Sequence, residues 1–418
     1  MPGHAEAGPP AAGRRGRELP LLFLGSTFAL GGAERVLAHL AHGLARPPFR
    51  VEIAALRDPG AVGLELRRAG LVVHSNLTGR ARLDPFAIPR LRAIMKRGRF
   101  EAVYFLDHAH AVFHGVLASL DTQVRVRVMP VHTTGQWHGR RSIGRPIRLM
   151  MRRLDRIIAI AETQREYLIR EEGIDPAKLV VIPNGVPLEQ PDPATRRDRR
   201  AEARALLGVA EETPVIGITA VLRPEKNHEL LLRAFARVRA DVQDAELWII
   251  GDGPRRAALE AEAARLGLPA AREQDRVLPG ESRSVARSRV AVRFLGRRSD
   301  ARLLMAGFDI AVLSSHPRVE TLPLSLIEAM DAGVPVVSTR VGALAELIEE
   351  ERSGLLVAPG DEAALCASLQ RLCRDSAARR SFGARGQAIA RERYAVEIMV
   401  ESTRRLLLEL LGENGVSG

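Results

Sequence analysis

The stretch Ile310-Ala-Val-Leu-Ser-Ser-His-Pro-Arg-Val-Glu-Thr-Leu-Pro-Leu-Ser-Leu-Ile-Glu-Ala-Met-Asp-Ala-Gly-Val-Pro-Val-Val-Ser338 decides the fold class. A short apolar run comes first, then a polar loop, and then an apolar helical segment that begins after Pro323 and stops at Gly333. A second apolar run follows at once. A strand, a helix and a strand in this order are typical of a parallel sheet, so the stretch predicts one βαβ unit of an α/β protein.

The same alternation of strands and helices continues through the chain in two series. The segment 187–200 between them is rich in proline and charge, which is typical of a linker. Two such series predict two Rossmann-like domains that face each other across a cleft, with ligands outside the carboxyl ends of the strands. The first series has strands expected at 21–24, 51–56, 71–74, 102–106, 124–130, 157–161 and 179–182, and the second at 215–220, 247–250, 292–295, 310–313, 334–338 and 354–357.

We divide the chain accordingly into a disordered extension (1–20), an N-terminal domain (21–190), a C-terminal domain (191–385) and a last helical part (386–418). Residues 1–20 have no apolar core, so we do not expect them to be a secretory signal. Residues 381–411 have the apolar spacing of a helix. The segment 269–289 has little apolar periodicity, and we expect an exposed insertion loop there.

Composition limits the class of protein. A chain of 418 residues with 46% hydrophobic residues suits two globular domains. No run of about 18 apolar residues occurs, so no membrane span is expected. The two cysteines, Cys366 and Cys373, lie seven apart in a predicted helix, which suits neither a disulfide framework nor a common zinc site. We therefore expect a cytoplasmic protein.

The chain has a net charge of +12, and only three of its 62 basic residues are lysines: Lys96, Lys178 and Lys226. A positive field of this size implies an anionic partner or surface. Aromatic residues make up only 4% and are not interleaved with the basic clusters, which argues against nucleic acid as the partner.

The strongest candidate site lies in the quoted stretch. Ser325 and Glu328 form a narrow polar stripe on an otherwise apolar helix, and Glu320 lies in the loop just before it. A carboxylate on such a helix needs a partner, and ribose hydroxyls can provide one. The helix N-terminus offers backbone N–H groups to a phosphate. The alternative is that Glu328 pairs with a neighbouring arginine, and the spacing leaves both interpretations open.

Two further segments could hold an anion. Arg223 and Lys226 follow the first strand of the second series and could neutralise a diphosphate. The alternative is a solvated helix start, which is less favourable because a cation there opposes the helix dipole. Gly31-Gly32 follows the first strand of the first series and allows close approach of an anion. Its spacing is not G-x-G-x-x-G, which argues against a dinucleotide cofactor.

The histidines give weaker signals. His132 comes two residues after an expected strand and is well placed to contact a sugar, although a histidine with a purely structural role is equally compatible with its position. His108, His110 and His114 have spacings of two and four without a converging carboxylate, so we expect a structural role and no metal there.

Taken together and in this order, the motifs resemble the group 1 family of retaining nucleotide-sugar glycosyltransferases, which have the two-domain GT-B fold. The resemblance spans roughly Leu21 to Tyr394. It is most specific at Glu320 and Glu328, which have seven residues between them and are followed by Ala329-Met330, Gly333-Val-Pro-Val-Val-Ser338 and Gly342.

The resemblance implies roles for individual residues. Glu328 would hold the ribose, Glu320 the donor sugar and Lys226 the diphosphate, while Gly31-Gly32 would approach the diphosphate on domain closure and His132 would lie near the sugar. Residues 251–254 and 294–296 match the loops around the base, and 183–186 match the crossing into the second domain. The implied catalytic residues are Glu320, His132 and Lys226; the implied donor contacts are Gly31, Gly32, Arg223, Lys226, Gly251, Leu295, Thr321, Leu322, Leu324, Ser325 and Glu328, with no metal ligand.

Two positions depart from the family pattern. Val221 stands where the family usually has an arginine, and Arg223 could project from the same side of an extended segment and replace it. Thr321 stands where the family usually has glycine, and threonine would be strained there if the backbone were left-handed.

The resemblance implies sugar transfer from a nucleoside diphosphate to a hydroxyl acceptor, with retained configuration and no cofactor or metal. The first domain would be the acceptor side, the second would bind the nucleotide sugar, and the last helix would pack back on the first. The arginine-rich stretch 140–156 suggests attachment to an anionic membrane at its inner face, where a lipid-linked acceptor would lie. The alternatives are an epimerase or a pyridoxal-phosphate phosphorylase on the same fold, or a non-enzymatic basic protein that binds membrane or nucleic acid.

Overall fold

The computed structural model describes residues 17–29, 31–79, 84, 86–107, 110–132, 145–189, 192–272, 290–317 and 320–413. Within these residues each predicted series forms a sheet of seven parallel strands, one more than the six expected in the second series, and the predicted fold class is confirmed. In the first sheet the order is β3 (Val72–His74), β2 (Phe49–Ala55), β1 (Leu19–Gly25), β4 (Ala102–Phe105), β5 (Val126–Val131), β6 (Arg156–Ala159) and β7 (Leu179–Val181).

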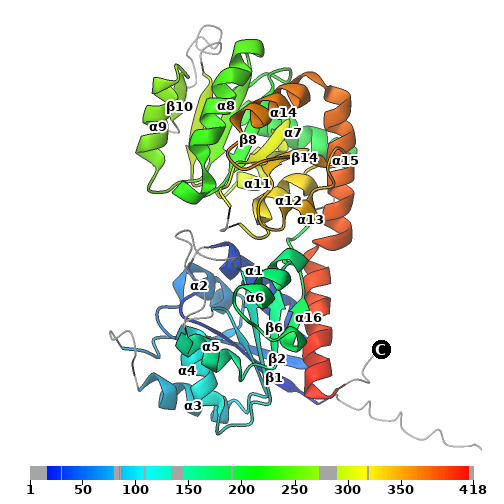
Figure 1. The fold of residues 1–418 in the computed structure, drawn as a ribbon. Coiled ribbons are helices and arrows are strands. Elements are labelled where there is room, and N and C mark those ends of the chain that lie inside the picture. Colours follow the sequence, from blue (N-terminus) through cyan, green and yellow to red (C-terminus); the bar gives the residue numbers. More distant parts are fainter. Residues whose placement is uncertain are drawn as a thin grey trace, which may run out of the picture.

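The second sheet has the same kind of order, with one crossover at its outer edge. Its strands are nearly continuous apolar runs because helices cover both faces of the sheet (Figure 1). The order is β10 (Ala270–Arg272), β11 (Val292–Gly296), β9 (Glu246–Ile250), β8 (Val215–Thr219), β12 (Ile310–Leu313), β13 (Val336–Thr339) and β14 (Gly354–Val357).

The helices divide into two sets, one for each sheet. Apolar side chains fill the space between the helices and both faces of each sheet, so each domain has two core layers. The first set is α1 (Gly32–Leu44), α2 (Gly60–Arg68), α3 (Ala87–Arg97), α4 (His110–Ser119), α5 (Arg145–Met151) and α6 (Glu162–Arg170). The second is α7 (Pro193–Leu207), α8 (His228–Asp241), α9 (Arg256–Arg265), α11 (Ala301–Ala306), α12 (Leu324–Asp331), α13 (Leu344–Leu347), α14 (Glu362–Arg374) and α15 (Ser376–Arg393), and the chain ends with α16 (Val396–Leu411).

The strand order reverses at one point in each sheet. In the first sheet this point lies between β1 and β4, and in the second between β8 and β12. Loops that follow the two central strands at such a point lead to opposite faces of the sheet and leave room for a ligand between them. The second sheet therefore brings the loop after β8 beside the loop after β12.

Four predicted boundaries are wrong. The segment 187–200 is not all linker, because α7 begins at Pro193: the Asp192 side chain accepts hydrogen bonds from the N–H groups of Ala194 and Thr195. Residues 19–20 belong to β1 and not to the extension 1–20, of which residues 1–16 lie outside the described part. Within 269–289, residues 270–272 form the edge strand β10, and 273–289 lie outside the described residues. The predicted boundary between the N-terminal and C-terminal domains, at 190/191, also lies outside the described residues.

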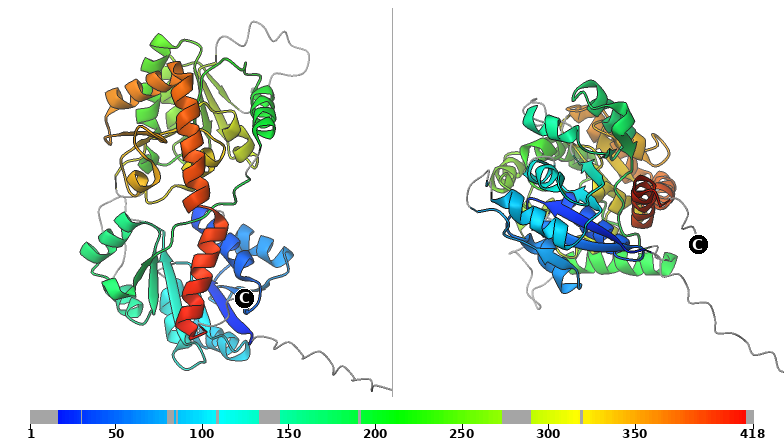
Figure 2. Two further views of the ribbon diagram at one scale, coloured as in Figure 1. Left: turned by 90° about the vertical axis from the view of Figure 1, so that its right-hand side faces the viewer. Right: turned by 90° about the horizontal axis from the view of Figure 1, so that it is seen from below.

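The fourth wrong boundary lies at the end of the chain, where the single helix expected over residues 381–411 is two separate helices. The helix α15 runs through the predicted boundary at residue 386 and packs on α12, whereas α16 packs on α1 of the first domain. The approach to α1 is close, because a Cβ at Gly43 would lie 2.5 Å from Val400 Cγ2. Figure 2 shows the two helices following each other along one side of the molecule.

Two connections join the domains. One is the segment around Val186 and the other is the break between α15 and α16, and they pair at Val186 and Ala395. No helix in the described part of the chain is both long and apolar enough to cross a membrane.

Candidate functional site

The loop after β8 places Lys226 beside the end of β12. The turn Pro224–Lys226 is a short 3-10 helix, and Asn227 follows it with a left-handed backbone (φ 49°), a conformation that asparagine tolerates well. Ser314, directly after β12, donates its hydroxyl to the carbonyl oxygens of Lys226 and Asn227 at 3.1 and 2.9 Å. The side chain at the end of one strand thus fixes the loop that follows its neighbour.

Glu320 lies opposite Lys226 and pairs with it. The distance from Lys226 Nζ to Glu320 Oε2 is 2.5 Å, and the Ser315 hydroxyl donates to the same oxygen at 3.0 Å. Glu320 is 8% exposed, and burying a carboxylate is costly unless it has a partner, which Lys226 provides here. The predicted residues Lys226 and Glu320 are therefore brought together.

The backbone of the Glu320 loop is held by the loop after β13. Gly342 has a φ of +52°, and a Cβ there would lie 2.0 Å from the Glu320 carbonyl oxygen, so only glycine fits. The Ala343 N–H donates to the Thr321 carbonyl oxygen at 2.9 Å. Positive φ occurs at four non-glycine residues of the described part, and Thr321 is not among them. The strain considered for threonine at this position is therefore absent.

Glu328 is in a different situation from Glu320. It lies half-buried on α12, and no hydrogen bond or ion pair within the described part of the chain holds its carboxylate. Burial raises the pKa of Glu328, while the attraction of Arg302 and Arg35 partly opposes the rise. The structural alternative, an ion pair with a neighbouring arginine, is not formed with any arginine that the structure describes. The carboxylate is desolvated and still has its acceptor sites open.

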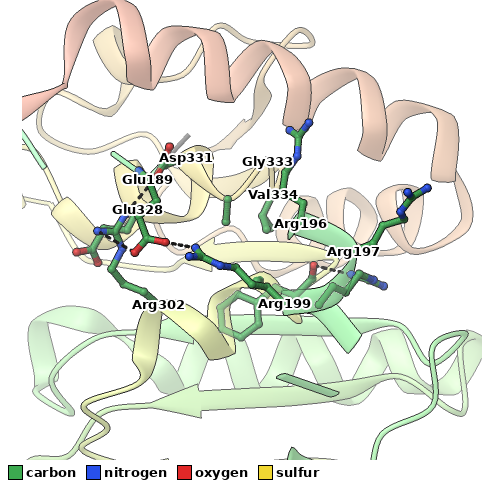
Figure 3. A pocket seen from close by; sticks show the side chains of 13 residues that line it. Glu189, Arg196, Arg197, Arg199, Arg302, Glu328, Asp331, Gly333 and Val334 are labelled. Atoms are coloured by element: carbon green, nitrogen blue, oxygen red, sulfur yellow. Dashed lines mark hydrogen bonds and ion pairs between the residues drawn. The ribbon is translucent and has the colours of Figure 1, made fainter. Parts of the chain in front are cut away.

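A pocket of about 200 Å³ opens beside Glu328, where α7 and α11 meet the end of α12 (Figure 3). Asp331, three residues after Glu328 on α12, also lines it, and Arg302 binds the Asp331 carboxylate at 3.0 Å. The other lining groups include Arg196 and Arg199 of α7, which bind Gln387 and Glu189. Most of the arginines here have partners in the protein, so we regard the pocket as the polar surroundings of Glu328.

The first domain approaches the same helix with its glycine loop. A Cβ at Gly32 would lie 3.7 Å from Leu324 Cδ1, so this loop faces the beginning of α12. Gly31 has an ordinary extended backbone, but a Cβ there would lie 2.3 Å from Glu34 Oε2. The Glu34 carboxylate thus folds back over the start of α1, where the sequence predicts an external anion.

Glu34 is a residue that the sequence analysis missed. Burial raises the pKa of the Glu34 carboxyl, its own N–H lowers it, and Asp107 raises it further. Any anion that binds at the start of α1 must first displace this carboxylate. An acidic residue in the first helical turn, two positions after a pair of glycines, is a signal that could have revealed it.

The segment that contains Val221 and Arg223 is not simply extended. The Arg223 N–H donates to the Val221 carbonyl oxygen at 2.8 Å, which closes a tight turn at Leu222. The side chains of Val221 and Arg223 therefore do not follow the alternation of an extended segment, on which the expected replacement by Arg223 depends. Both side chains are well exposed, and Arg223 lies 3.9 Å from the Glu225 carboxylate.

The loops after β9 and β11 contact each other beside β8. The Gly251 N–H donates to the Gly296 carbonyl oxygen at 2.7 Å, and a Cβ at Gly251 would lie 2.0 Å from the Ala220 carbonyl oxygen. Leu295 and Leu322 are buried, whereas Leu324 and Ser325 are half-buried. None of these residues carries a charge.

The histidines differ in their surroundings. His132 directly follows β5 and is half-buried, and the residues after it, 133–144, lie outside the described ones. His114 is buried and its Nδ1 bonds the His110 carbonyl oxygen at 2.9 Å, as expected of a structural residue, while His108 is outside the described part. Burial lowers the pKa of His228, at the start of α8, to about 4, so this ring is neutral. Among the described residues no group of three or more His, Cys, Asp or Glu is arranged to hold a metal ion.

Two family models match the chain, one for each domain. The model described as "Glycosyl transferases group 1" matches residues 213–375, and the model described as "Glycosyltransferase Family 4" matches residues 30–190.

Individual curated relatives agree with these matches. The chain is 27% identical over 317 residues to the Bacillus subtilis protein assigned as glycosyltransferase EpsF, covering 73% of this chain and 75% of that protein. It is 33% identical over 227 residues to the D-inositol 3-phosphate glycosyltransferase of Geodermatophilus obscurus, covering 52% of this chain and 45% of the relative. The chain spans about half the length of several of the relatives it matches, and about a quarter of an exopolysaccharide phosphotransferase from Streptomyces coelicolor.

Solved structures share the fold. HepE of Anabaena, crystallised with UDP, superposes with a TM-score of 0.76 at 23% identity, covering 94% of this chain and 100% of that one. A glycosyltransferase from Rickettsia africae has a TM-score of 0.78 at 18% identity, covering 95% and 99%. The arrangement of the two domains is therefore the GT-B fold.

The Glu328 carboxylate, which has no partner in the described part of the chain, has a consequence for stability. Because the folded-state pKa is raised, the ionised form destabilises the fold at neutral pH, and this cost disappears as the pH falls through that pKa. We expect Glu328→Gln, without ligand, to melt at or above the wild-type temperature at pH 7.5, with the difference vanishing toward pH 4. Differential scanning fluorimetry across this range measures it. A clear fall in melting temperature at pH 7.5 would mean that the ionised carboxylate stabilises the fold.

Proposed function

Since the chain belongs to the group 1 glycosyltransferases, we propose that it transfers a sugar from a nucleoside-diphosphate sugar to a hydroxyl group of an acceptor, with retention of the anomeric configuration. The relatives named above support the reaction class. HepE binds UDP and UDP-glucose in its crystals, which supports a nucleotide-sugar donor for the same fold.

One observation carries the proposal most strongly. Glu328 is a desolvated carboxylate without a partner among the described residues, on the helix α12 that begins at Leu324, shortly after the Glu320 of the Lys226–Glu320 pair. A carboxylate in this state stabilises a ligand that donates two hydrogen bonds, and the adjacent hydroxyls of a ribose do so. The diphosphate attached to that ribose would then reach Lys226.

Charge neutralisation by Lys226 would supply most of the rate. As the bond between the anomeric carbon and the diphosphate breaks, negative charge grows on the leaving oxygen, and a fixed ammonium and helix N–H groups stabilise it. A donor phosphate at Lys226 would replace Glu320 as its partner and free the Glu320 carboxylate for sugar hydroxyls. The acceptor oxygen bonds to the anomeric carbon on the same face, and its proton passes to the departing diphosphate. No metal is required in this scheme.

The lysines argue against a phosphorylase that uses pyridoxal phosphate. Lys178 donates to the carbonyl oxygens of Arg152 and Leu154, and Lys96 pairs with Asp121 on the surface. Lys226 is already the partner of Glu320, so a Schiff-base lysine would have to come from that pair. The relatives favour transfer over epimerisation, which would proceed without any acceptor.

A glycan or lipid-linked acceptor at the inner face of a membrane fits the surface of the first domain. Arg152 and Arg153 are exposed beside α5, where Leu149 is 55% exposed. Such a basic and apolar surface would bind anionic lipid by charge and by partial insertion. We expect the protein to sediment with vesicles that contain phosphatidylglycerol and not with neutral phosphatidylcholine vesicles. Equal recovery in both supernatants would remove the membrane from the proposal.

The decisive variant is Lys226→Ala. We expect it to lower kcat/KM for transfer by about 10²–10³-fold, because the departing diphosphate loses its ammonium. Release of nucleoside diphosphate from a panel of UDP-, GDP- and ADP-sugars measures the rate, and NMR of the product gives the anomeric configuration. Lys96→Ala is the matched control, since its lysine pairs with Asp121 at a distance from the site. Transfer by Lys226→Ala at the rate of the control would refute the assignment, and an inverted product would refute retention.

A further inference from the structure

One carboxylate crosses the interface between the domains. Glu346 belongs to the short helix α13 of the second domain, and its partners lie at the start of α6 in the first. Glu346 Oε2 accepts from the Glu162 N–H at 2.9 Å, and Oε1 accepts from the Thr163 N–H at 2.7 Å and from the Thr163 hydroxyl. Figure 1 shows α6 at the end of the first domain that faces α13.

The start of α6 lacks a cap of its own. Its N-cap residue is Ala161, with an extended backbone and no side-chain oxygen to accept the free N–H groups of the first turn. Serine or aspartate in that position would provide a local cap. Here a residue 184 positions away provides it, and a carboxylate is the group that a helix N-terminus favours. The stability of this helix end thus depends on the position of the other domain.

On the first-domain side the contact leads to His132. Gln164, in the first turn of α6, is buried, accepts from the Ile160 N–H at 2.7 Å and donates to the Val131 carbonyl oxygen at 2.9 Å. Val131 ends β5 and precedes His132 directly. The start of α6 is therefore tied to the strand end that carries the proposed sugar-contacting histidine.

On the second-domain side the contact leads to the donor loop. The helix α13 begins directly after Gly342 and Ala343, the two residues that fit against the backbone of Glu320 and Thr321. Arg393, just before the second domain connection, donates to the Glu346 carbonyl oxygen at 3.0 Å. A contact beside the domain connections is displaced only slightly when the two domains rotate about these connections. It can therefore persist while parts farther away move.

We propose that Glu346 is a positioning residue for transfer: by capping α6 from the other domain, it holds the His132 side of the first domain in register with the Glu320–Thr321 loop. The inference rests on the proposed function. Donor binding and slow donor hydrolysis require mainly the second domain, whereas transfer to an acceptor requires both domains in register. Loss of Glu346 should therefore lower the rate of transfer to the acceptor while donor binding and donor hydrolysis are largely kept.

The test compares Glu346→Ala with Glu350→Gln, a control whose carboxylate pairs with Arg340 inside the second domain. For Glu346→Ala we expect transfer kcat to fall about tenfold, because a small misplacement of reacting groups is costly, while the Kd for the nucleoside diphosphate stays within about twofold. The ratio of donor hydrolysis to transfer should rise. The control should keep the wild-type values of all three quantities.

A second variant separates positioning from simple helix capping. Ala161→Ser in the Glu346→Ala background gives α6 a local cap without restoring the link between the domains. We expect thermal stability to recover and the transfer defect to persist. Full recovery of transfer would overturn the proposal, as would a wild-type kcat for Glu346→Ala. If the wild-type protein neither binds nor hydrolyses any nucleotide sugar, the proposed function itself fails instead.

Discussion

The ion pair between Lys226 and Glu320 depends on the order of the strands. The two residues are 94 positions apart, and they meet because β8 and β12 are neighbours at the point where the strand order reverses. Serine side chains at the end of β12 then fix both partners, one through backbone carbonyls and one through the Glu320 carboxylate. The pair stabilises two charges in a mostly buried place, which neither residue could occupy alone.

Glu328 lies on α12, the helix that follows the Glu320 loop, and differs from Glu320 in having no such ion pair within the described residues. Its carboxylate is desolvated but has no partner in the described part of the chain, and burial raises its pKa. Buried groups of this kind reduce stability and are retained where a ligand completes them. The site therefore combines two features. The Lys226–Glu320 ion pair can exchange partners when a phosphate binds to Lys226. The Glu328 carboxylate can accept hydrogen bonds from the hydroxyl groups of a ligand.

Much of this could be predicted from sequence because the signals are local. The unit from β12 to β13 has its first strand at the predicted residues 310–313, and the loops with Lys226 and Glu320 follow predicted strands. The start of α7 was missed although Asp192 and Pro193 are a recognisable cap, because the surrounding segment is polar and charged. The strand β10 has only three residues and no pattern to detect. The link from Glu346 to α6 depends on how two domains dock, which no local pattern encodes.

Equilibrium binding of nucleoside diphosphates, measured by isothermal titration calorimetry at pH 7.5, tests most directly whether Glu328 belongs to a donor site. The wild-type protein should bind at least one of UDP, GDP and ADP with a stoichiometry of one. Glu328→Gln should bind the same nucleotide at least about tenfold more weakly, because a neutral amide accepts fewer hydrogen bonds from the ribose hydroxyls than a carboxylate. Equal affinity of the two proteins, or no binding of any nucleoside diphosphate to the wild type, would contradict the assignment of this site.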